Sequence, residues 1–361
     1  MSAAAPPYNP DQLLSLESSL NSHILGQEDA TKHIAQVLLN SAAGFKAPEK
    51  PRGVFLLTGP TGVGKTETAL ALAKPDVFYP SYSEENLQHY NPQLKILNMG
   101  EFQHSHEVAK LLGSPPGYLG HRETQPVMAT VADNPRTVFV LDEVEKAHPE
   151  IFDALMGPFD KGKMTTGDNR ELNFNQALFL LTSNHPAPDK ILRKEFLNRM
   201  DAVLKYKPLQ KEHYKVLIDR KLGDISAAML EQFGVALSMD PKEIDRFATL
   251  LVKQAEGRAK GGPSHSIGFN SARRPDNPVM VDASREIQPG TGARELDRII
   301  EKSLVPITRF LIKNQWKTGQ NGVRPAQIVI KDLFTFRAEV QNGKGEPIQT
   351  ISERSAAAVG R

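Results

Sequence analysis

Short, almost continuous apolar runs alternate along the first two-thirds of the chain with segments in which apolar residues recur every three or four positions. Five runs predict strands: Val54–Thr58, Lys95–Met99, Thr137–Leu141, Ala177–Thr182 and Ala202–Tyr206. Several are apolar at nearly every position, which is typical of parallel strands covered on both faces. The alternation of these runs with helical segments predicts an α/β fold built on a five-stranded parallel sheet.

Helical periodicity flanks this region on both sides. Residues 11–20 and 29–43 precede the first strand, and residues 212–233, 241–256 and 293–311 follow Pro208. Residues 326–340 predict one or two strands, and residues 257–292 are rich in Gly, Pro and Ser, as in a long loop or mobile insertion. We expect a flexible lead at 1–10, a large domain at 11–207, a smaller and mainly helical domain at 208–341, and a disordered tail at 342–361.

The composition narrows the class of protein. With 361 residues, the chain is too long for one compact core. Its net charge of +2 provides no bulk attraction for nucleic acid or membranes. The lack of cysteine excludes disulfides, thiolate metal sites and thiol catalysis. Neither a secretory signal nor an apolar run of roughly 20 residues is present, so we expect a soluble cytoplasmic protein.

A glycine-rich segment follows the first predicted strand and precedes a helix. It reads Gly59-Pro60-Thr61-Gly62-Val63-Gly64-Lys65-Thr66. Strand, glycine-rich turn and helix form the context in which this pattern binds phosphate through backbone N–H groups and the helix N-terminus. Lys65 is expected to reach the β- and γ-phosphates, and the Thr66 hydroxyl to bind Mg²⁺. A chance glycine-rich turn would not require these flanks, so the sequence predicts a nucleoside triphosphate site.

Polar residues end two further strands. Asp142 and Glu143 follow the apolar run 137–141, and Asn184 follows the run 177–182. The carboxyl ends of parallel strands meet at one edge of a sheet, beside the phosphate-binding loop. Asp142 is therefore expected to hold Mg²⁺ and Glu143 to act as general base on water. A neutral amide at Asn184 suits orientation of the water or contact with the γ-phosphate.

Four segments resemble one family. Leu141–Pro149 (LDEVEKAHP), Gly113–Gly120 (GSPPGYLG), Glu195–Asp201 (EFLNRMD) and Gly292-Ala293-Arg294 are similar to the second ATPase module of ClpB- and ClpA-type unfoldases. The resemblance runs from about Leu20 to about Val340, with the motifs in the family's order. It implies an AAA+ module of the Clp branch, with a sheet-containing nucleotide-binding domain, a smaller lid domain, and ATP and Mg²⁺ as cofactors.

The same resemblance implies roles for individual residues. The segment His23–Gln27, including Ile24 and Leu25, would line the adenine pocket. Arg199 would be the arginine finger that reaches the γ-phosphate of a neighbouring subunit, and Arg294 would sense that phosphate from the lid. The pore loop Gly117-Tyr118-Leu119-Gly120 would grip an extended polypeptide, and a second pore loop would fall near residues 163–170.

The chain also departs from the family. It has one ATPase module rather than two, and no substrate-binding or coiled-coil domain is expected. No room exists between Asn184 and Arg199 for a loop that docks on a peptidase. Residues 75–92 and 257–292 look inserted, either for partner specificity or as exposed elaborations without a role.

The predicted function is that of a homo-oligomeric, hexameric ATPase that threads or remodels protein substrates, with or without an adaptor. The first alternative is an AAA+ loader or transposition-type switch acting on nucleic acid, which the basic residues between Arg258 and Arg285 keep open. The second is an ATP-dependent assembly scaffold that changes shape without threading.

Overall fold

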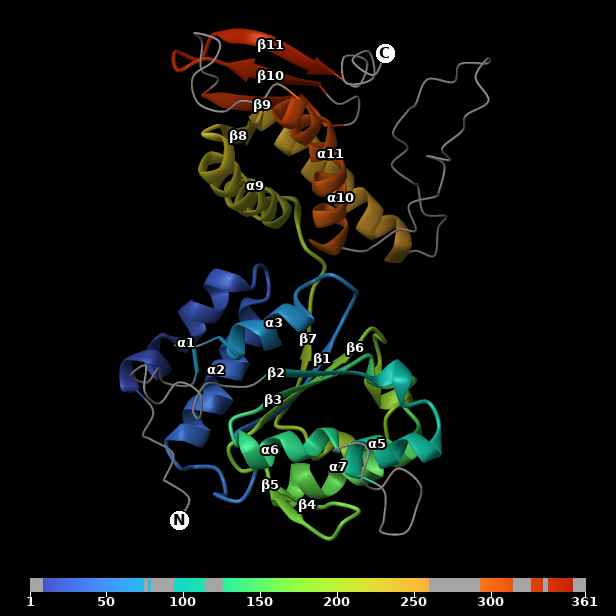
Figure 1. Cartoon of the computed structure of the whole chain (residues 1–361). Coiled ribbons are helices and arrows are strands. Elements are labelled where there is room, and N and C mark those ends of the chain that lie inside the picture. Colours follow the sequence, from blue (N-terminus) through green and yellow to red (C-terminus); the bar gives the residue numbers. More distant parts are fainter. Residues whose placement is uncertain are drawn as a thin grey trace, which may run out of the picture. The chain divides into compact units, whose positions relative to one another are not determined.

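The computed structural model describes residues 9–74, 77–78, 94–113, 126–259, 293–313, 326–333 and 337–352. These residues fall into two compact units, one within 1–208 and the other within 209–361 (Figure 1). Each unit has its own hydrophobic core. The two are therefore described separately.

The first unit is built on a five-stranded sheet in the order β2-β3-β6-β1-β7. All neighbouring strands in it are parallel. The strands are β1 (Gly53–Thr58), β2 (Leu94–Asn98), β3 (Val138–Asp142), β6 (Leu178–Ser183) and β7 (Ala202–Lys205). Each overlaps one of the five predicted runs, so the predicted fold class is confirmed.

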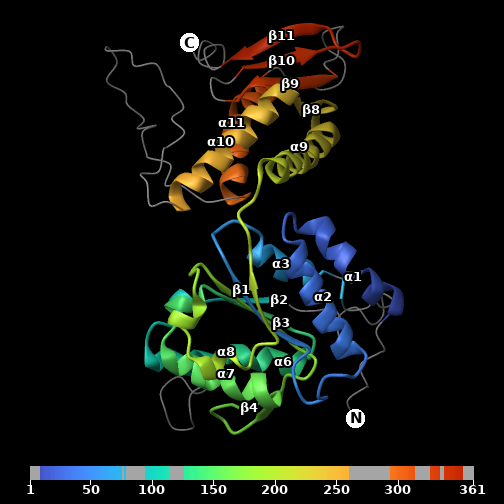
Figure 2. The same ribbon diagram turned by 180° about the vertical axis from the view of Figure 1, so that it is seen from behind.

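Side chains of the central strands alternate between two cores, one on each face of the sheet. Phe55 and Leu57 face the core that includes α1 (Pro10–His23), α2 (Glu28–Ala42) and α3 (Lys65–Leu72). Val54 and Leu56 face the core formed with α5 (Val108–Leu112), α6 (Thr130–Asp133), α7 (Pro149–Lys161) and α8 (Lys194–Leu197). Figures 1 and 2 show these two groups of helices on opposite faces of the sheet.

Short elements complete the first unit. A hairpin is formed by β4 (Lys163–Thr165) and β5 (Glu171–Asn173). It spans the segment predicted to hold a second pore loop. The 3-10 turns are η2 (Met99–Glu101), η3 (Ser105–Glu107), η4 (Val127–Ala129), η5 (Val144–Lys146) and η6 (Pro188–Lys190). Val77 and Phe78, within the segment predicted as an insertion, are buried in the core beside α3.

In the part of the second unit that the structure describes, three helices pack against a small sheet. The helices are α9 (Lys211–Phe233), α10 (Pro241–Ala259) and α11 (Ala293–Lys313). The sheet has the order β11-β10-β9-β8, in which β8 and β9 are parallel and the other pairs antiparallel. Its strands are β8 (Ala236–Met239), β9 (Gln327–Asp332), β10 (Arg337–Gln341) and β11 (Pro347–Ser352).

Strand β11 corrects one prediction. Residues 342–361 were expected to be a disordered tail, but residues 347–352 pair with β10 along its length. Ile351 is 2% exposed and belongs to the core of the second unit. The tail prediction is therefore wrong for this strand, because β10 supplies the backbone partners that a polar strand lacks by itself.

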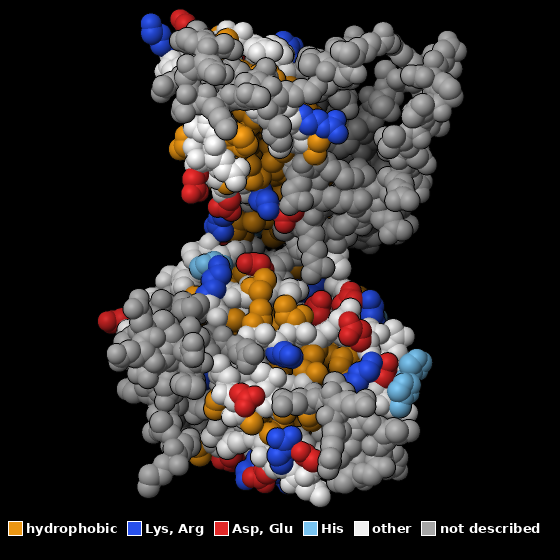
Figure 3. All heavy atoms as spheres, in the orientation of Figure 1, with side chains coloured by type: hydrophobic (Ala, Val, Ile, Leu, Met, Phe, Trp, Pro, Cys, Tyr) orange, Lys and Arg blue, Asp and Glu red, His pale blue; other side chains and the backbone are white. Residues whose placement is uncertain are grey.

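The surface carries charges of both signs. On the face shown in Figure 3, Lys and Arg side chains are interspersed with Asp and Glu, and the coloured residues form no large area of one sign. Among the helices that the structure describes, none combines the length and apolar character needed to cross a membrane.

Candidate nucleotide-binding site

The glycine-rich segment forms the tight connection between β1 and α3. Gly59, Gly62 and Gly64 have φ angles of 139°, 74° and 104°, values that favour glycine strongly. A Cβ atom on Gly59 would also lie 2.6 Å from the carbonyl oxygen of Tyr206. The glycines are therefore needed both for the backbone turn and for its close approach to the end of β7.

Backbone donors of this loop are left available. Among the described residues, none accepts a hydrogen bond from the backbone N–H of Gly62, Val63 or Gly64. These groups lie directly before α3, where the helix N-terminus adds positive potential. The loop therefore has the donors and the field that an anionic phosphate group requires.

Lys65 begins α3 and is 6% exposed. Its ammonium donates to the carbonyl oxygens of Gly59 and Pro60 at 2.7 and 2.6 Å. It also donates to Oδ1 of Asn184 at 3.0 Å. The cation thus lies inside the loop and contacts the residue that follows β6.

Buried hydrogen bonds fix the loop from behind. The Thr68 hydroxyl donates to the carbonyl oxygen of Gly64 at 2.9 Å and lies 2.7 Å from the Tyr206 hydroxyl. Burial raises the pKa of Tyr206 well above its ordinary value, so this phenol remains neutral. The Thr68 and Tyr206 hydroxyls together connect the first turn of α3 to the residue that follows β7.

The segment between α1 and α2 lies against the same loop. Ile24 is 2% exposed, and its Cγ2 atom lies 3.5 Å from the position a Cβ atom would take on Gly64. Leu25 is half-buried. The Gln27 side chain donates to the carbonyl oxygens of Val63 at 3.3 Å and Lys207 at 2.8 Å. The segment expected to line the adenine pocket is thereby attached to the phosphate-binding loop.

Thr182 organises the two acids after β3. Its hydroxyl, on a side chain that is 1% exposed, donates to Oδ1 of Asp142 at 2.5 Å. The Thr182 hydroxyl oxygen in turn accepts the backbone N–H of Glu143 at 3.1 Å. Glu143 has φ 59° and ψ 54°, the left-handed conformation that is uncommon outside glycine. Thr182 therefore holds a strained backbone at the site, as is common for functional residues.

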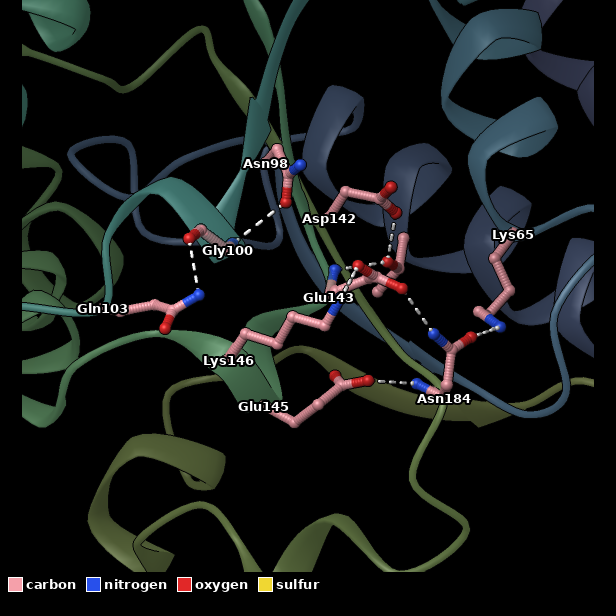
Figure 4. A network of polar contacts seen from close by, with 10 residues as sticks. Lys65, Asn98, Gly100, Gln103, Asp142, Glu143, Glu145, Lys146 and Asn184 are labelled. Atoms are coloured by element: carbon pink, nitrogen blue, oxygen red, sulfur yellow. Dashed lines mark hydrogen bonds and ion pairs between the residues drawn. The ribbon is translucent and has the colours of Figure 1, made fainter.

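Asn184 joins the cation of the loop to the acids, as Figure 4 shows. Its Oδ1 accepts from Lys65, and its Nδ2 donates to Oε1 of Glu143 at 3.0 Å. Its backbone N–H donates to Oε1 of Glu145 at 3.0 Å. The other Glu143 oxygen, Oε2, lies 2.5 Å from the ammonium of Lys146. Residues that follow β3 and β6 and the first residue of α3 thus form one connected polar network.

The residues fit a nucleotide with its magnesium ion. Hard oxygen ligands suit Mg²⁺, and the half-buried Asp142 carboxylate and Thr66 hydroxyl provide them at neighbouring strand and helix ends. The available N–H groups of the loop and the Lys65 ammonium suit the phosphates. The predicted residues of the loop, Asp142, Glu143 and Asn184 are all brought together here.

Arg199, Arg294 and the pore-loop residues have no described contact with this network. Arg199 follows α8, is 39% exposed in its side chain, and donates to Asp160 on α7 at 2.8 Å. Arg294 lies in α11, but its side chain is outside the described part of the chain. The pore-loop residues Gly117, Tyr118, Leu119 and Gly120 also lie outside the described residues.

Sequence reasoning missed several residues of the network. Thr182, Glu145 and Lys146 have direct contacts there, and Asp160 pairs with Arg199. Thr182 could have been found as the last polar residue of an otherwise apolar run. Glu145 and Lys146 carried no distinct signal, since a turn rich in charges is usually solvated.

Comparison with known proteins places these observations in a family. Residues 50–218 match the family described as AAA domain (Cdc48 subfamily). The chain is 35% identical over 338 residues to "Chaperone protein ClpB 2" of Parasynechococcus marenigrum, which covers 87% of this chain and 32% of that protein. It is 29% identical over 333 residues to "Chaperone protein ClpB" of Meiothermus ruber, covering 86% and 34% respectively.

The name of a third relative refers to a protease rather than to a chaperone. The chain is 31% identical over 259 residues to "ATP-dependent Clp protease ATP-binding subunit ClpE" of Bacillus subtilis, covering 65% of this chain and 35% of that protein. The chain thus spans about a third of the length of the curated relatives it matches. With residues 50–218 forming an AAA domain on a five-stranded parallel sheet, the chain belongs to the AAA+ proteins and is ClpB-like over most of its length.

Proposed function

We propose that this chain is a ring-forming ATPase that remodels protein substrates by threading them through a central pore. The observation that carries the ATPase part is the bridge made by Asn184 between Lys65 and Glu143. One amide contacts both the cation for the phosphates and the carboxylate for the water. Such a link lets occupation of the phosphate site affect the base directly.

The roles follow from the chemistry of each group. Lys65 and the loop N–H groups bind the β- and γ-phosphates, and the Asp142 carboxylate and Thr66 hydroxyl hold Mg²⁺. The metal ion, when bound, neutralises charge that develops on the phosphate oxygens. Glu143 accepts the proton of the attacking water, and Asn184 orients that water. Ile24 and Leu25 border the adenine base.

Two variants separate binding from hydrolysis. Lys65→Ala should abolish ATP binding, since the phosphates lose their mobile cation. Glu143→Gln should bind ATP normally but stop turnover, because an amide cannot accept the proton. Isothermal titration calorimetry and phosphate release measure the two steps. Normal turnover by Glu143→Gln would exclude this residue as the base.

We propose a ring because Arg199 contacts none of the described residues of the nucleotide site of its own chain. Its side chain is half-exposed and pairs with Asp160. In the proposed hexamer it stabilises the transition-state charge in a neighbour's site, while Arg294 contacts the nucleotide bound by its own chain. Arg199→Ala should therefore bind ATP but not hydrolyse it.

Mixing variants tests the shared site. In rings that combine Arg199→Ala and Glu143→Gln chains, some interfaces have an intact Glu143 on one side and an intact Arg199 on the other. These rings should regain part of the activity, with each variant alone as the control. No recovery in rings shown by mass spectrometry to be mixed would contradict a site shared between subunits.

Threading is proposed from the contacts of the residues that flank positions 114–125, which lie outside the described residues. A Cβ atom on Gly113 would lie 2.8 Å from Cγ of Pro126, so the two flanking residues are in contact. The backbone N–H of Gly167, in the β4–β5 hairpin, donates to the carbonyl oxygen of Leu112 at 2.9 Å. The bases of the two proposed pore loops are therefore adjacent, as a shared grip on one polypeptide requires.

Tyr118→Ala tests the grip. ATP turnover should persist, because Tyr118 has no role in phosphate chemistry, while unfolding of a tagged fluorescent protein should fail for lack of aromatic contact area. Tyr118→Phe, which keeps the ring, is the matched control. If Tyr118→Ala unfolds the substrate normally, the threading model is wrong and a switch or scaffold becomes the better proposal.

A role on nucleic acid is the second candidate, and it rests on the basic residues between Arg258 and Arg285. The mixed charges of Figure 3 and the net charge of +2 favour protein substrates. A salt titration of DNA binding separates the two, since DNA affinity that falls steeply with salt would support the alternative. The protein substrate, an adaptor and a cytoplasmic location remain predictions.

A further inference from the structure

Glu143, the base proposed for hydrolysis, contacts a second cation, Lys146, that has no role in the proposed binding of the phosphates. Lys146 lies three residues after Glu143, across the turn η5, and its Nζ atom is 2.5 Å from Oε2 of Glu143. In Figure 4, Lys146 approaches this carboxylate from the side opposite to Lys65. Its contact with Glu143 therefore lies away from the phosphate-binding loop.

Both oxygens of the Glu143 carboxylate have partners in this arrangement. Oε1 accepts from Asn184, and Oε2 pairs with Lys146. The backbone beneath is fixed in the left-handed conformation by Thr182, so the side chain can change direction only through its own torsions. A carboxylate with both oxygens engaged must give up one of these partners before it can contact an attacking water.

A second carboxylate is close to the same lysine in sequence. Glu145 Oε1 accepts the Asn184 N–H, while its buried Oε2 has no hydrogen-bond partner among the described residues. The pKa of Lys146 is raised by its hydrogen bond with Glu143 and further by the charges of Glu143, Glu145 and Asp142. Lys146 thus remains a cation, and its ion pair among the described residues is the one with Glu143.

We propose that Lys146 is a positioning residue that restrains Glu143 in the resting site and must release it before water can be activated. This proposal rests on the proposed function and adds a regulatory contact to it. Release costs little, because the side chains of Lys146 and Glu143 are 49% and 28% exposed and such pairs are weak. The restraint therefore sets the basal rate without blocking turnover.

The test compares three lysine variants of the full chain. Lys146→Met keeps the length of the side chain and removes its charge, so kcat for ATP hydrolysis without protein substrate should rise about two- to fivefold. KM for ATP should stay within about twofold, since the phosphate-binding groups are untouched. Lys146→Arg keeps the cation and should retain the low basal rate.

Lys110→Met is the matched control, because Lys110 also pairs with a glutamate three residues away, Glu107, at 3.4 Å and outside the network. It should leave kcat unchanged. If Lys146→Met has the wild-type kcat, or a lower one that Lys146→Arg restores, the restraint is wrong. If the wild-type chain hydrolyses no ATP at all, the proposed function itself fails, which is a separate and distinguishable result.

Discussion

Replacing Thr182 with valine removes one hydroxyl from the centre of the site and nearly preserves the shape of the side chain. The hydroxyl donates to Asp142 and accepts from the backbone N–H of Glu143. Thr182 is 1% exposed, so water cannot readily replace it for the Glu143 N–H. The variant Thr182→Val therefore tests whether this contact supports the acids.

The structure sets the expected size of the effect. A neutral hydrogen bond contributes about 1 kcal/mol and one to a charged group about 1.5–3 kcal/mol. Asp142 is half-buried and can recruit water, so we take the lower end for that bond and expect a total loss of about 2.5 kcal/mol in the free energy of unfolding. The left-handed conformation of Glu143 costs about 1–2 kcal/mol, so its backbone should relax without the acceptor.

Relaxation should move the base away from its working position. A loss of about 1.4 kcal/mol in transition-state stabilisation corresponds to about a tenfold lower rate, so turnover of Thr182→Val should fall at least about tenfold. Urea unfolding followed by circular dichroism measures stability, and phosphate release at saturating ATP measures turnover. Turnover should be compared under conditions in which each variant is fully folded.

Thr137→Val is the control for stability alone. Thr137 is 0% exposed and lies before the opposite end of β3, where its hydroxyl donates to the carbonyl oxygen of Asn134 at 2.7 Å. The Thr137→Val variant should lose about 1 kcal/mol in its free energy of unfolding and hydrolyse ATP at the wild-type rate. If Thr182→Val hydrolyses ATP as fast as Thr137→Val, Thr182 does not support the acids and the reasoning is refuted.

Three further variants test the surroundings. Gly59→Ala should destabilise the first unit by at least about 2 kcal/mol in urea unfolding, because its Cβ atom would clash with Tyr206. Gln27→Ala should weaken ATP binding measured by calorimetry, since it frees the loop at Val63; unchanged affinity would contradict this. The pKa of Asp240 lies below its ordinary value of 3.8, chiefly because its carboxylate accepts the Lys242 N–H. The ionised Asp240 side chain therefore stabilises the fold above about pH 4, and this contribution is lost as the pH falls through the lowered pKa. Asp240→Asn should reduce this acid dependence of the urea midpoint.

Strands that are buried on both faces could be predicted because nearly all of their residues are apolar. The run Val54–Thr58, for example, corresponds to β1 at Gly53–Thr58, buried at every position. Strands β8 and β11 were missed for the opposite reason. The sequence of β11, Pro347–Ser352, is half polar, and its conformation depends on pairing with β10 rather than on its own composition.

The same distinction applies to the site. Lys65, Asp142, Glu143 and Asn184 were expected together because parallel strands end at one edge of the sheet. The contacts of Lys146 could not be predicted, since the left-handed backbone of Glu143 sets the direction of both side chains. That conformation depends on a hydroxyl from β6, a tertiary contact that local sequence does not encode.

The contact between Gly113 and Pro126 has a consequence for how this fold can diverge. Because the fold already brings these two positions together, the described residues fix both ends of any segment that joins them. Loop-closure entropy rises slowly with length, by about 0.6 kcal/mol for each doubling. Foreign segments of different length could therefore be grafted between Gly113 and Pro126 while the sheet and the nucleotide site stay intact. Gly113 itself, with φ 86° and Pro126 against it, is the position such grafts should leave unchanged.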